Sequence, residues 1–385
     1  MVLERRPLVL EVGQIVAGPT AGLILADLGF NVIKVEQPGR GDIARYFTGP
    51  SRGNFAFFNR GKRSITLNLR SVEGREIFLK LVARADVVID NLGYGTMDRL
   101  GLGYQDLIRV NPSIVYLSIK GYGKGPYEDR NALDYPIEVE TGVAYMNGLT
   151  GKPMRLGASI IDMAAAMLGV IGVLHALMER ERTGKGAFIR VGLFEAAMFL
   201  MGQHIAAYQA RGNVPLKPLN EEGFAWAIYD FFETADGKRI FIAVTTDAQW
   251  VKFCEALKLP VCGLPEYATN EGRYARRNEL IPMISKVVSQ FNSQDLIKIL
   301  RSNGISYALL NTPWDLLTDE HARSKMVRVN YEGREMAIPY TPIEGTLAQA
   351  SIKDPPKLGE DTEAILLELG YSLNEIENLK KRGII

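Results

Sequence analysis

The chain has 385 residues, of which 47% are hydrophobic, 9% aromatic and 23% charged, and its formal net charge is +1 at pH 7. These values are typical of a soluble globular protein with two or three domains. The balanced charge argues against a nucleic-acid or membrane partner, and three histidines and two cysteines are too few to predict a metal site or a disulfide framework.

Residues 1–7 are rich in charge and lack the apolar core of a signal peptide. The longest apolar stretch, 163–178, is short for a membrane span. We therefore expect a cytoplasmic protein, in which Cys254 and Cys262 stay reduced.

Strand and helix patterns alternate along the first third of the chain. The β-rich runs cover 8–12, 31–36, 86–90 and 114–119, and helical patterns cover 20–28 and 71–85 and end near 109–112. Gly29 stands where a helix commonly ends on a left-handed glycine. Strands separated by helices predict a parallel sheet covered by helices, with a ligand site at the carboxyl ends of the strands.

Glycine-bearing segments follow these strands, at 16–19, 36–42, 91–95 and 120–126. Such glycines let the backbone approach a ligand, but they are equally common in ordinary turns. The first strand is not followed by Gly-x-Gly-x-x-Gly, and the chain has no phosphate-binding Walker loop. The pattern therefore disfavours an NAD-dependent dehydrogenase despite the alternating strands and helices.

Asp162 is the only ionisable residue between Arg155 and His175, and it opens a helical run that is almost wholly apolar. A carboxylate in that place caps the helix, is solvated, or serves chemistry. Because aspartate is a preferred capping residue, the local signals alone favour the cap.

A second region begins after residue 208. The polar, glycine- and proline-bearing segment 209–225 predicts a linker or mobile loop. Two β-rich runs that flank Ala-Asp-Gly-Lys within 227–244 predict a hairpin. Helical patterns then cover 247–258, 277–302, 360–370 and 372–381.

A series of different short motifs is distributed along the chain. They are Ala17-Gly-Pro19, Ala26-Asp-Leu-Gly29, Val32-Ile-Lys-Val-Glu36, Asn59-Arg-Gly-Lys-Arg-Ser64, Leu67-Asn-Leu69, Asp90-Asn91, Asp98-Arg-Leu-Gly101, Asn111-Pro112, Lys120-Gly-Tyr-Gly123, Thr183-Gly-Lys-Gly186 and Phe232-Glu-Thr-Ala-Asp-Gly237. Together they resemble the class III coenzyme A transferases, the family of formyl-CoA transferase and the carnitine CoA-transferases. The alpha-methylacyl-CoA racemases share the fold of this family.

The resemblance implies an α/β fold with a Rossmann-like large domain built from both termini, a smaller inserted α/β domain, and an interlocked, ring-like homodimer. On this chain the large domain is expected at 1–208 and 311–385, the linker at 209–225 and the small domain at 226–310.

The resemblance also assigns Asp162 as the catalytic residue, because Gly157-Ala-Ser-Ile-Ile-Asp162 matches the approach to the family's aspartate. A carboxylate attacks a thioester to give a mixed anhydride, and the returning CoA thiolate converts that anhydride into an aspartyl-CoA thioester. Each step passes through an oxyanion that backbone N–H groups stabilise. No cofactor is bound permanently, and coenzyme A enters as the acyl-CoA substrate.

Matching positions imply ten contacts to coenzyme A. They are Val16, Ala17, Arg40, Leu69, Arg70, Asp90, Asn91, Arg99, Lys120 and Tyr122. Two positions depart from formyl-CoA transferase, which has glutamine where this chain has Val16 and arginine where it has Gln37. We expect Arg40 to take over from that arginine, and Val16 argues against a formyl or oxalyl substrate.

Three functions stay open at this point. A racemase would carry histidine immediately before Asp134, where this chain has Leu133, and His175 reads as a core residue, so CoA transfer is favoured. A non-catalytic CoA-binding paralogue is disfavoured because Asp162 is present. The surrounding segments resemble transferases of short dicarboxylates such as mesaconate or citramalate, with succinyl-CoA as a donor.

Three side chains are candidates for binding such an acid: Arg45, Glu140 and Arg155. Arginine suits a distal carboxylate because it pairs with it bidentately. Glu138 is read as a solvated or capping residue.

Overall fold

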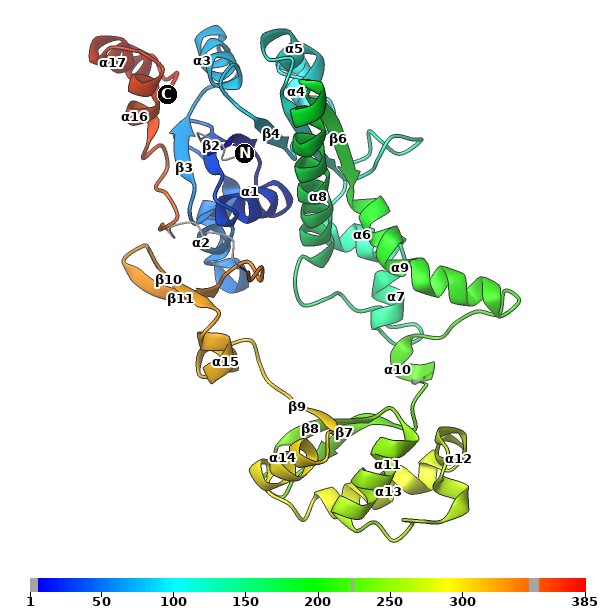
Figure 1. Cartoon of the computed structure of the whole chain (residues 1–385). Helices are drawn as coiled ribbons and strands as arrows, with labels where there is room; N and C mark the ends of the chain where they lie inside the picture. Colours follow the sequence, from blue (N-terminus) through cyan, green and yellow to red (C-terminus); the bar gives the residue numbers. More distant parts are fainter. Residues whose placement is uncertain (1–5, 223–224, 346–352) are drawn as a thin grey trace. The chain divides into compact units, whose positions relative to one another are not determined.

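The structure is a computed structural model that describes residues 6–222, 225–345 and 353–385. The chain divides into two compact units, one made of residues 1–218 and 324–385 and the other of residues 219–323 (Figure 1). Residues 311–323, expected in the large domain, thus fall in the second unit.

The larger unit contains a six-stranded sheet. Its strands are β1 (Leu8–Val12), β2 (Asn31–Glu36), β3 (Arg63–Thr66), β4 (Val87–Asp90), β5 (Val115–Lys120) and β6 (Ala187–Gly192). The order is β3-β2-β1-β4-β5-β6, and every neighbouring pair is parallel, which confirms the predicted sheet. The strand order reverses between β1 and β4, where ligands bind in open α/β sheets.

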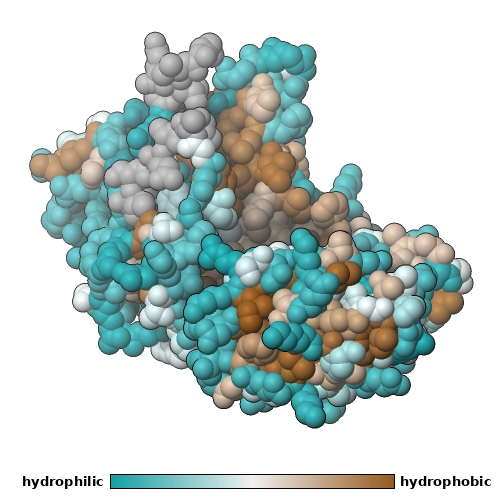
Figure 2. Space-filling view, turned by 60° about the horizontal axis from the view of Figure 1, so that its bottom comes forward, coloured by the Kyte–Doolittle hydropathy of each residue, from teal (hydrophilic) through white to brown (hydrophobic). Residues whose placement is uncertain are grey.

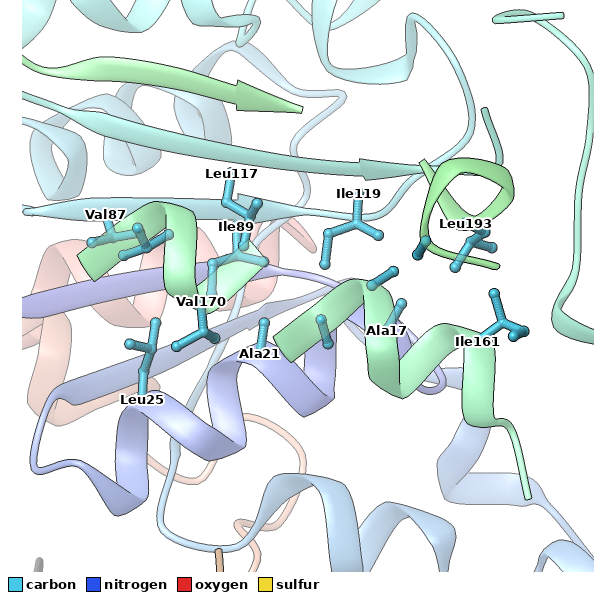
Figure 3. Close-up of a cluster of buried hydrophobic side chains, with 14 of the residues drawn as sticks. Ala17, Ala21, Leu25, Val87, Ile89, Leu117, Ile119, Ile161, Val170 and Leu193 are labelled. Atoms are coloured by element: carbon cyan, nitrogen blue, oxygen red, sulfur yellow. The ribbon is translucent and has the colours of Figure 1, made fainter. Parts of the chain in front are cut away.

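Helices cover both faces of the sheet. α1 (Ala17–Asp27) and α8 (Ile160–Thr183) share one buried cluster with β1, β4 and β5 (Figure 3). The small residues of α8 allow this close approach, since a Cβ at Gly169 would lie 3.0 Å from the Leu117 side chain. Gly29 ends α1 with a φ of +93°, as predicted.

The opposite face is covered by helices from both ends of the chain. They are α3 (Val72–Val82), α5 (Tyr104–Val110), α16 (Thr362–Glu368) and α17 (Leu373–Lys381), which share a second buried cluster. The C-terminal helices are anchored to β3, because the Thr66 N–H donates to the Thr362 hydroxyl at 3.0 Å.

The remaining elements of this unit border the sheet or its loops. They are α2 (Asn54–Asn59), α4 (Thr96–Arg99), α6 (Asp134–Glu140), α7 (Val143–Asn147), α9 (Leu193–Ala210) and the hairpin β10 (Met326–Tyr331) and β11 (Arg334–Pro339). The short 3₁₀ helices lie at 43–46 and 49–51.

The second unit is a smaller α/β module. Its antiparallel sheet comprises β7 (Ile228–Glu233), β8 (Arg239–Val244) and β9 (Ser306–Leu309), and it includes the predicted hairpin. The helices are α10 (Leu219–Glu222), α11 (Asp247–Leu257), α12 (Asn270–Ala275), α13 (Arg277–Val288), α14 (Ser293–Ser302) and α15 (Glu320–Arg323), with 3₁₀ turns at 265–267 and 315–317.

The expectation that both cysteines are reduced thiols is wrong for this structure. Cys254 and Cys262 are joined by a disulfide. Cys254 lies in α11, and the chain turns back after that helix, where the Leu259 N–H donates to the Cys254 carbonyl. This turn brings the two Cα atoms to 5.5 Å, a separation that a disulfide spans.

Among the described residues, α8 alone is long and apolar enough to cross a membrane by length and composition. A core helix of a soluble protein passes the same test, and α8 packs against α1, β5, β6 and α9. Several of its apolar side chains are nevertheless exposed, namely Met167, Ile171 and Met178. His175, expected in the core, is also exposed, because it points away from the face that packs on the sheet.

Candidate active site

Asp162 is the third residue of α8 and does not cap it, so the capping interpretation is wrong. The helix begins at Ile160, and its N-cap residue Ser159 makes no side-chain capping hydrogen bond. The cap comes instead from α6, where the Asp134 carboxylate accepts from the N–H groups of Ile161 at 2.9 Å and Asp162 at 3.0 Å. The carboxylate of Asp162 is thereby left available for chemistry.

The Asp162 carboxyl is half-buried and accepts no hydrogen bond from any residue that the structure describes. Its pKa is raised to about 7, first by burial and then by the negative charge of Asp134, while Arg155 opposes the shift. A weakly solvated carboxylate near neutral pH is a suitable nucleophile, because less solvation must be removed when it attacks.

The first turns of α1 and α8 lie at the same edge of the sheet. α1 follows β1 directly and α8 leads from β5 back to β6, so both helices begin at the carboxyl ends of the strands. Ala17 and Ile161 belong to one buried cluster, and Figure 3 shows them with Leu193 toward this end. Both helix N-termini favour negative charge here.

The loop between β1 and α1 is clamped from two sides. Asn91, directly after β4, exchanges hydrogen bonds with the backbone N–H and carbonyl of Gln14, at 2.8 and 2.9 Å. The N–H of Ile15 donates to the Asp42 carboxylate at 3.1 Å. Ile15 has a φ of +68°, which is strained for a β-branched residue, so these contacts hold the loop in a costly conformation.

A buried ion cluster of Glu11, Lys34, Asp42 and Lys62 supports this loop from below. Glu11 lies opposite Lys34 in the β1–β2 register and pairs with its Nζ at 2.8 Å and with Lys62 Nζ at 2.6 Å. Lys34 also pairs with Asp42 at 2.9 Å. Burial lowers the pKa of Lys62 to about 8, and Lys34 keeps its charge because three carboxylates face it.

The sequence reasoning missed this ion cluster. The signal was present, because two neighbouring strands each carry one charge inside an apolar run, Glu11 in β1 and Lys34 in β2. Such charges are almost never buried unless they are paired.

Some of the predicted CoA contacts meet around a cavity of about 250 Å³ at the carboxyl ends of β1 to β4. Leu69 and Arg70 line this cavity, together with Gln14, Gln37 and Leu92 among others. The buried residues Val16 and Ala17 come immediately after the loop that forms one of its walls. Arg40 is exposed and does not line the cavity.

Two other predicted CoA contacts, Asp90 and Lys120, form an ion pair with each other. Lys120 Nζ pairs with Asp90 at 2.7 Å and also donates to the Leu92 carbonyl. The buried Asp90 accepts further hydrogen bonds from the hydroxyls of Tyr116 and Ser118. These side chains line a second cavity, of about 190 Å³. The pair therefore stabilises the ends of β4 and β5 in this structure.

Arg99 and Tyr122 occupy different surroundings. Arg99 is exposed and donates to the Tyr94 carbonyl and the Thr96 hydroxyl. Tyr122 is buried, and its hydroxyl donates to Glu140 at 2.6 Å.

The three substrate candidates do not meet. Arg45 grips Glu36 through two hydrogen bonds, at 2.9 and 2.6 Å, and its side chain is 10% exposed. Glu140 is engaged by Tyr122 and by Arg130 at 3.0 Å. Arg155 stays accessible, with 51% of its side chain exposed, and its Nη2 lies 3.8 Å from Asp134.

The expectation that Glu138 is a solvated residue is wrong, since its exposure is 0%. Its position four residues after Asp134 places both side chains on the inner face of α6, against α8. Within the described residues, no group of three or more His, Cys, Asp or Glu side chains is arranged to hold a metal ion.

The chain is similar to known CoA-transferases over nearly its full length. The model of CoA-transferase family III matches residues 7–362. The succinyl-CoA:mesaconate CoA-transferase of Haloarcula marismortui is 33% identical and aligns over 96% of this chain and 98% of its own. The alpha subunit of the succinyl-CoA–L-malate CoA-transferase of Chloroflexus aurantiacus is 32% identical, over 98% and 91%.

A solved structure agrees with these similarities. A CAIB/BAIF family protein from Brucella suis superposes with a TM-score of 0.84, at 33% identity, covering 94% of this chain and 98% of the other.

Proposed function

The chain belongs to CoA-transferase family III and is a CoA-transferase, and from that premise we propose that it moves CoA from succinyl-CoA to a short dicarboxylic acid through covalent intermediates on Asp162. Relatives named for mesaconate and L-malate, and one from Agrobacterium fabrum named a succinate–glutarate CoA-transferase at 32% identity, support a dicarboxylate of four or five carbons.

The proposed reaction begins when the Asp162 carboxylate attacks the thioester carbonyl of the donor. The C–S bond breaks, CoA leaves as a thiolate, and a mixed anhydride remains on Asp162. The thiolate then attacks the aspartyl carbonyl, which releases the donor acid and leaves an aspartyl-CoA thioester. The acceptor carboxylate repeats both steps in reverse order, so that Asp162 is regenerated without a net proton change.

The observation that carries this proposal is the state of the Asp162 carboxylate. Its backbone N–H is tied to Asp134, while its side chain accepts no hydrogen bond among the residues that the structure describes. A structural aspartate at this depth would be expected to have partners. The adjoining starts of α1 and α8 would stabilise the oxyanion formed at each step.

Arg155 is the side chain that best fits the distal carboxylate of the acid. Its guanidinium is half-exposed and close to Asp134, in the segment that leads to Asp162. The guanidinium of Arg45 is occupied by Glu36, so that a substrate would have to displace a buried pair. Mesaconate and citramalate are the acids we would test first.

A homodimer is part of the proposal. α8 and α9 expose a set of large apolar side chains. Hydrophobic patches also interrupt the polar surface on the face of the molecule that Figure 2 shows. The exposed large apolar residues of α9 are Met198, Phe199, Leu200, Ile205 and Tyr208. Patches of this kind mark interfaces in soluble proteins. Light scattering should give twice the monomer mass, and Phe199→Glu should lower it; a monomeric wild-type protein would refute the dimer.

The decisive experiment for the mechanism is mass spectrometry of the protein incubated with succinyl-CoA. The peptide that contains Asp162 should gain the mass of CoA less one water, and Asp162→Ala should give neither the adduct nor CoA transfer. Full transfer activity in Asp162→Ala would refute the covalent mechanism. Deuterium exchange at the α-carbon of an acyl-CoA would instead indicate racemisation, which Leu133, 68% exposed, does not favour.

A further inference from the structure

Asp134 and Glu138 form a buried pair of carboxyls on α6. They are four residues apart, so their side chains lie on the same face of the helix. Asp134 is 5% exposed and Glu138 is 0% exposed. Two carboxyls this deeply buried cannot both be ionised at low cost, since like charges disfavour each other in a weakly polar interior.

Each carboxyl uses one oxygen to hold backbone and leaves the other without a hydrogen bond. Asp134 Oδ1 accepts from the N–H groups of Ile161 and Asp162, and Glu138 Oε2 accepts from the Leu156 N–H at 3.0 Å. Asp134 Oδ2 and Glu138 Oε1 are buried, and neither has a hydrogen-bond partner among the described residues. Buried oxygens of this kind are normally satisfied.

We propose that Glu138 retains its proton near neutral pH and donates it to Asp134, so that the pair is one buried monoanion that positions the Asp162 nucleophile. This inference rests on the proposed role of Asp162. A single O–H···O hydrogen bond satisfies both orphan oxygens at once. It also joins the two carboxyls that accept hydrogen bonds from the backbone at the two ends of the segment from Leu156 to Asp162.

The proton belongs on Glu138 for reasons of local charge. Two N–H groups at the start of α8 and the Arg155 guanidinium, 3.8 Å away, place positive charge beside Asp134. Glu138 accepts only one N–H group. Burial and the neighbouring Asp134 raise the pKa of Glu138, and the Leu156 N–H only partly opposes them.

The other charged groups around the pair do not change this assignment. Arg155 and Asp162 are the charges that act on it from the approach segment and from α8. Of the other helices packed against α6, α7 carries only Tyr145, whose hydroxyl donates to the Leu216 carbonyl. α9 carries Glu195, which accepts from the Gly123 N–H, the half-buried His204 and the exposed Tyr208.

The monoanion keeps the negative charge beside Asp162 at one. If Glu138 lost its proton, the two carboxylates would repel each other, and their hydrogen bonds to the backbone of the segment before Asp162 would weaken. The pKa of Asp162 would rise as well, because a second negative charge would stand near it. The pair thus keeps the nucleophile ionisable and fixed in place.

The test compares Glu138→Gln with Glu138→Leu. Glutamine can donate its amide N–H to Asp134 and accept from Leu156, so Glu138→Gln should keep kcat within about threefold of the wild type. Leucine can do neither, so Glu138→Leu should lower kcat about tenfold or more with little change in KM. A tenfold loss is the effect expected from one lost hydrogen bond. Glu181→Gln, on the exposed part of α8, is the control for a neutral change.

Infrared spectroscopy tests the proton itself, independently of activity. In the Asp162→Asn background at pH 8, the carbonyl band of a buried protonated carboxyl should be present, and it should vanish on adding Glu138→Gln. Absence of that band, or equal damage by the Gln and Leu variants, would overturn the proposal. If Asp162 were not the nucleophile, the band would still appear, so the two failures can be told apart.

Discussion

Replacing Asp162 by asparagine should make the protein more stable at pH 8 while abolishing CoA transfer. The wild-type carboxyl has its pKa raised from 3.8 to about 7, chiefly because burial disfavours its charge. Above pH 7 the folded protein therefore carries an ionised group in an unfavourable place. Asparagine has nearly the same shape and no charge, so the substitution removes this penalty without opening a cavity.

The size of the effect follows from the shift in pKa. A rise of about 3 units at about 1.4 kcal/mol per unit gives a ceiling of about 4 kcal/mol. Asp162 is only half-buried, and solvent screening reduces such figures, so about 2 kcal/mol is the expected gain. Catalytic sites commonly sacrifice stability in this way.

The sign of the pH dependence is fixed by linkage. Between about pH 4 and 7 the folded protein holds the Asp162 proton after the unfolded chain has lost it, so wild-type stability falls as the pH rises. Below about pH 4 both states are protonated and the two proteins should be equally stable. The advantage of Asp162→Asn should therefore grow across this window and level off above pH 7.

Urea unfolding at pH 5 and pH 8, at one fixed protomer concentration, measures this difference. Titration of other groups cancels when the two proteins are compared at the same pH. In the wild type, kcat/KM should fall as the pH drops below 7, because only the ionised carboxylate attacks. The reasoning fails if Asp162→Asn is less stable than the wild type at pH 8, or if the difference is the same at both pH values.

Three further substitutions have expected outcomes. Hydrogen bonds from Thr234 and Ser293 lower the pKa of Asp236 to about 2, so its ionised carboxylate stabilises the folded second unit at pH 8, and Asp236→Asn should lower that stability. Thermal unfolding at pH 8 measures the change, and an unchanged midpoint would contradict the prediction. Gly22→Ala should lower the free energy of unfolding by about 1–3 kcal/mol, because its Cβ would lie 1.9 Å from a Glu11 oxygen; an unchanged midpoint in the same melts would contradict it. Arg155→Ala should raise KM for a dicarboxylate about tenfold or more and leave KM for a monocarboxylate nearly unchanged, as steady-state kinetics would show.

The parallel sheet was predictable because its inner strands are mostly apolar runs between helical patterns. The edge strands β3 and β6 were missed for physical reasons. β3 is four residues long and begins with two polar residues, and most residues of β6 are only half-buried. An edge strand is covered less than a central one, so its sequence has a weaker pattern.

The site was predictable only in part. The motif before Asp162 predicted this residue as the nucleophile, but it could not show that α8 begins two residues earlier and that Asp134 supplies its cap from another helix. The positive charge of Arg45 suggested a substrate contact, but in the structure its guanidinium pairs with Glu36. Partners between segments distant in sequence are set by tertiary packing, and no local pattern specifies them.

The charges of the larger unit serve two different purposes. In the ion cluster under the β1–α1 loop, opposite charges face each other and hold Ile15 in a strained backbone conformation. Around Asp162, three carboxyls converge and Arg155 is the one arginine that acts on them among the described residues, so the local charge is left unbalanced. A balanced cluster stabilises a loop, whereas an unbalanced one keeps a carboxylate poorly solvated and reactive. That contrast supports the proposal that Asp162, and not Glu11 or Asp42, is the carboxylate that forms a bond with the substrate.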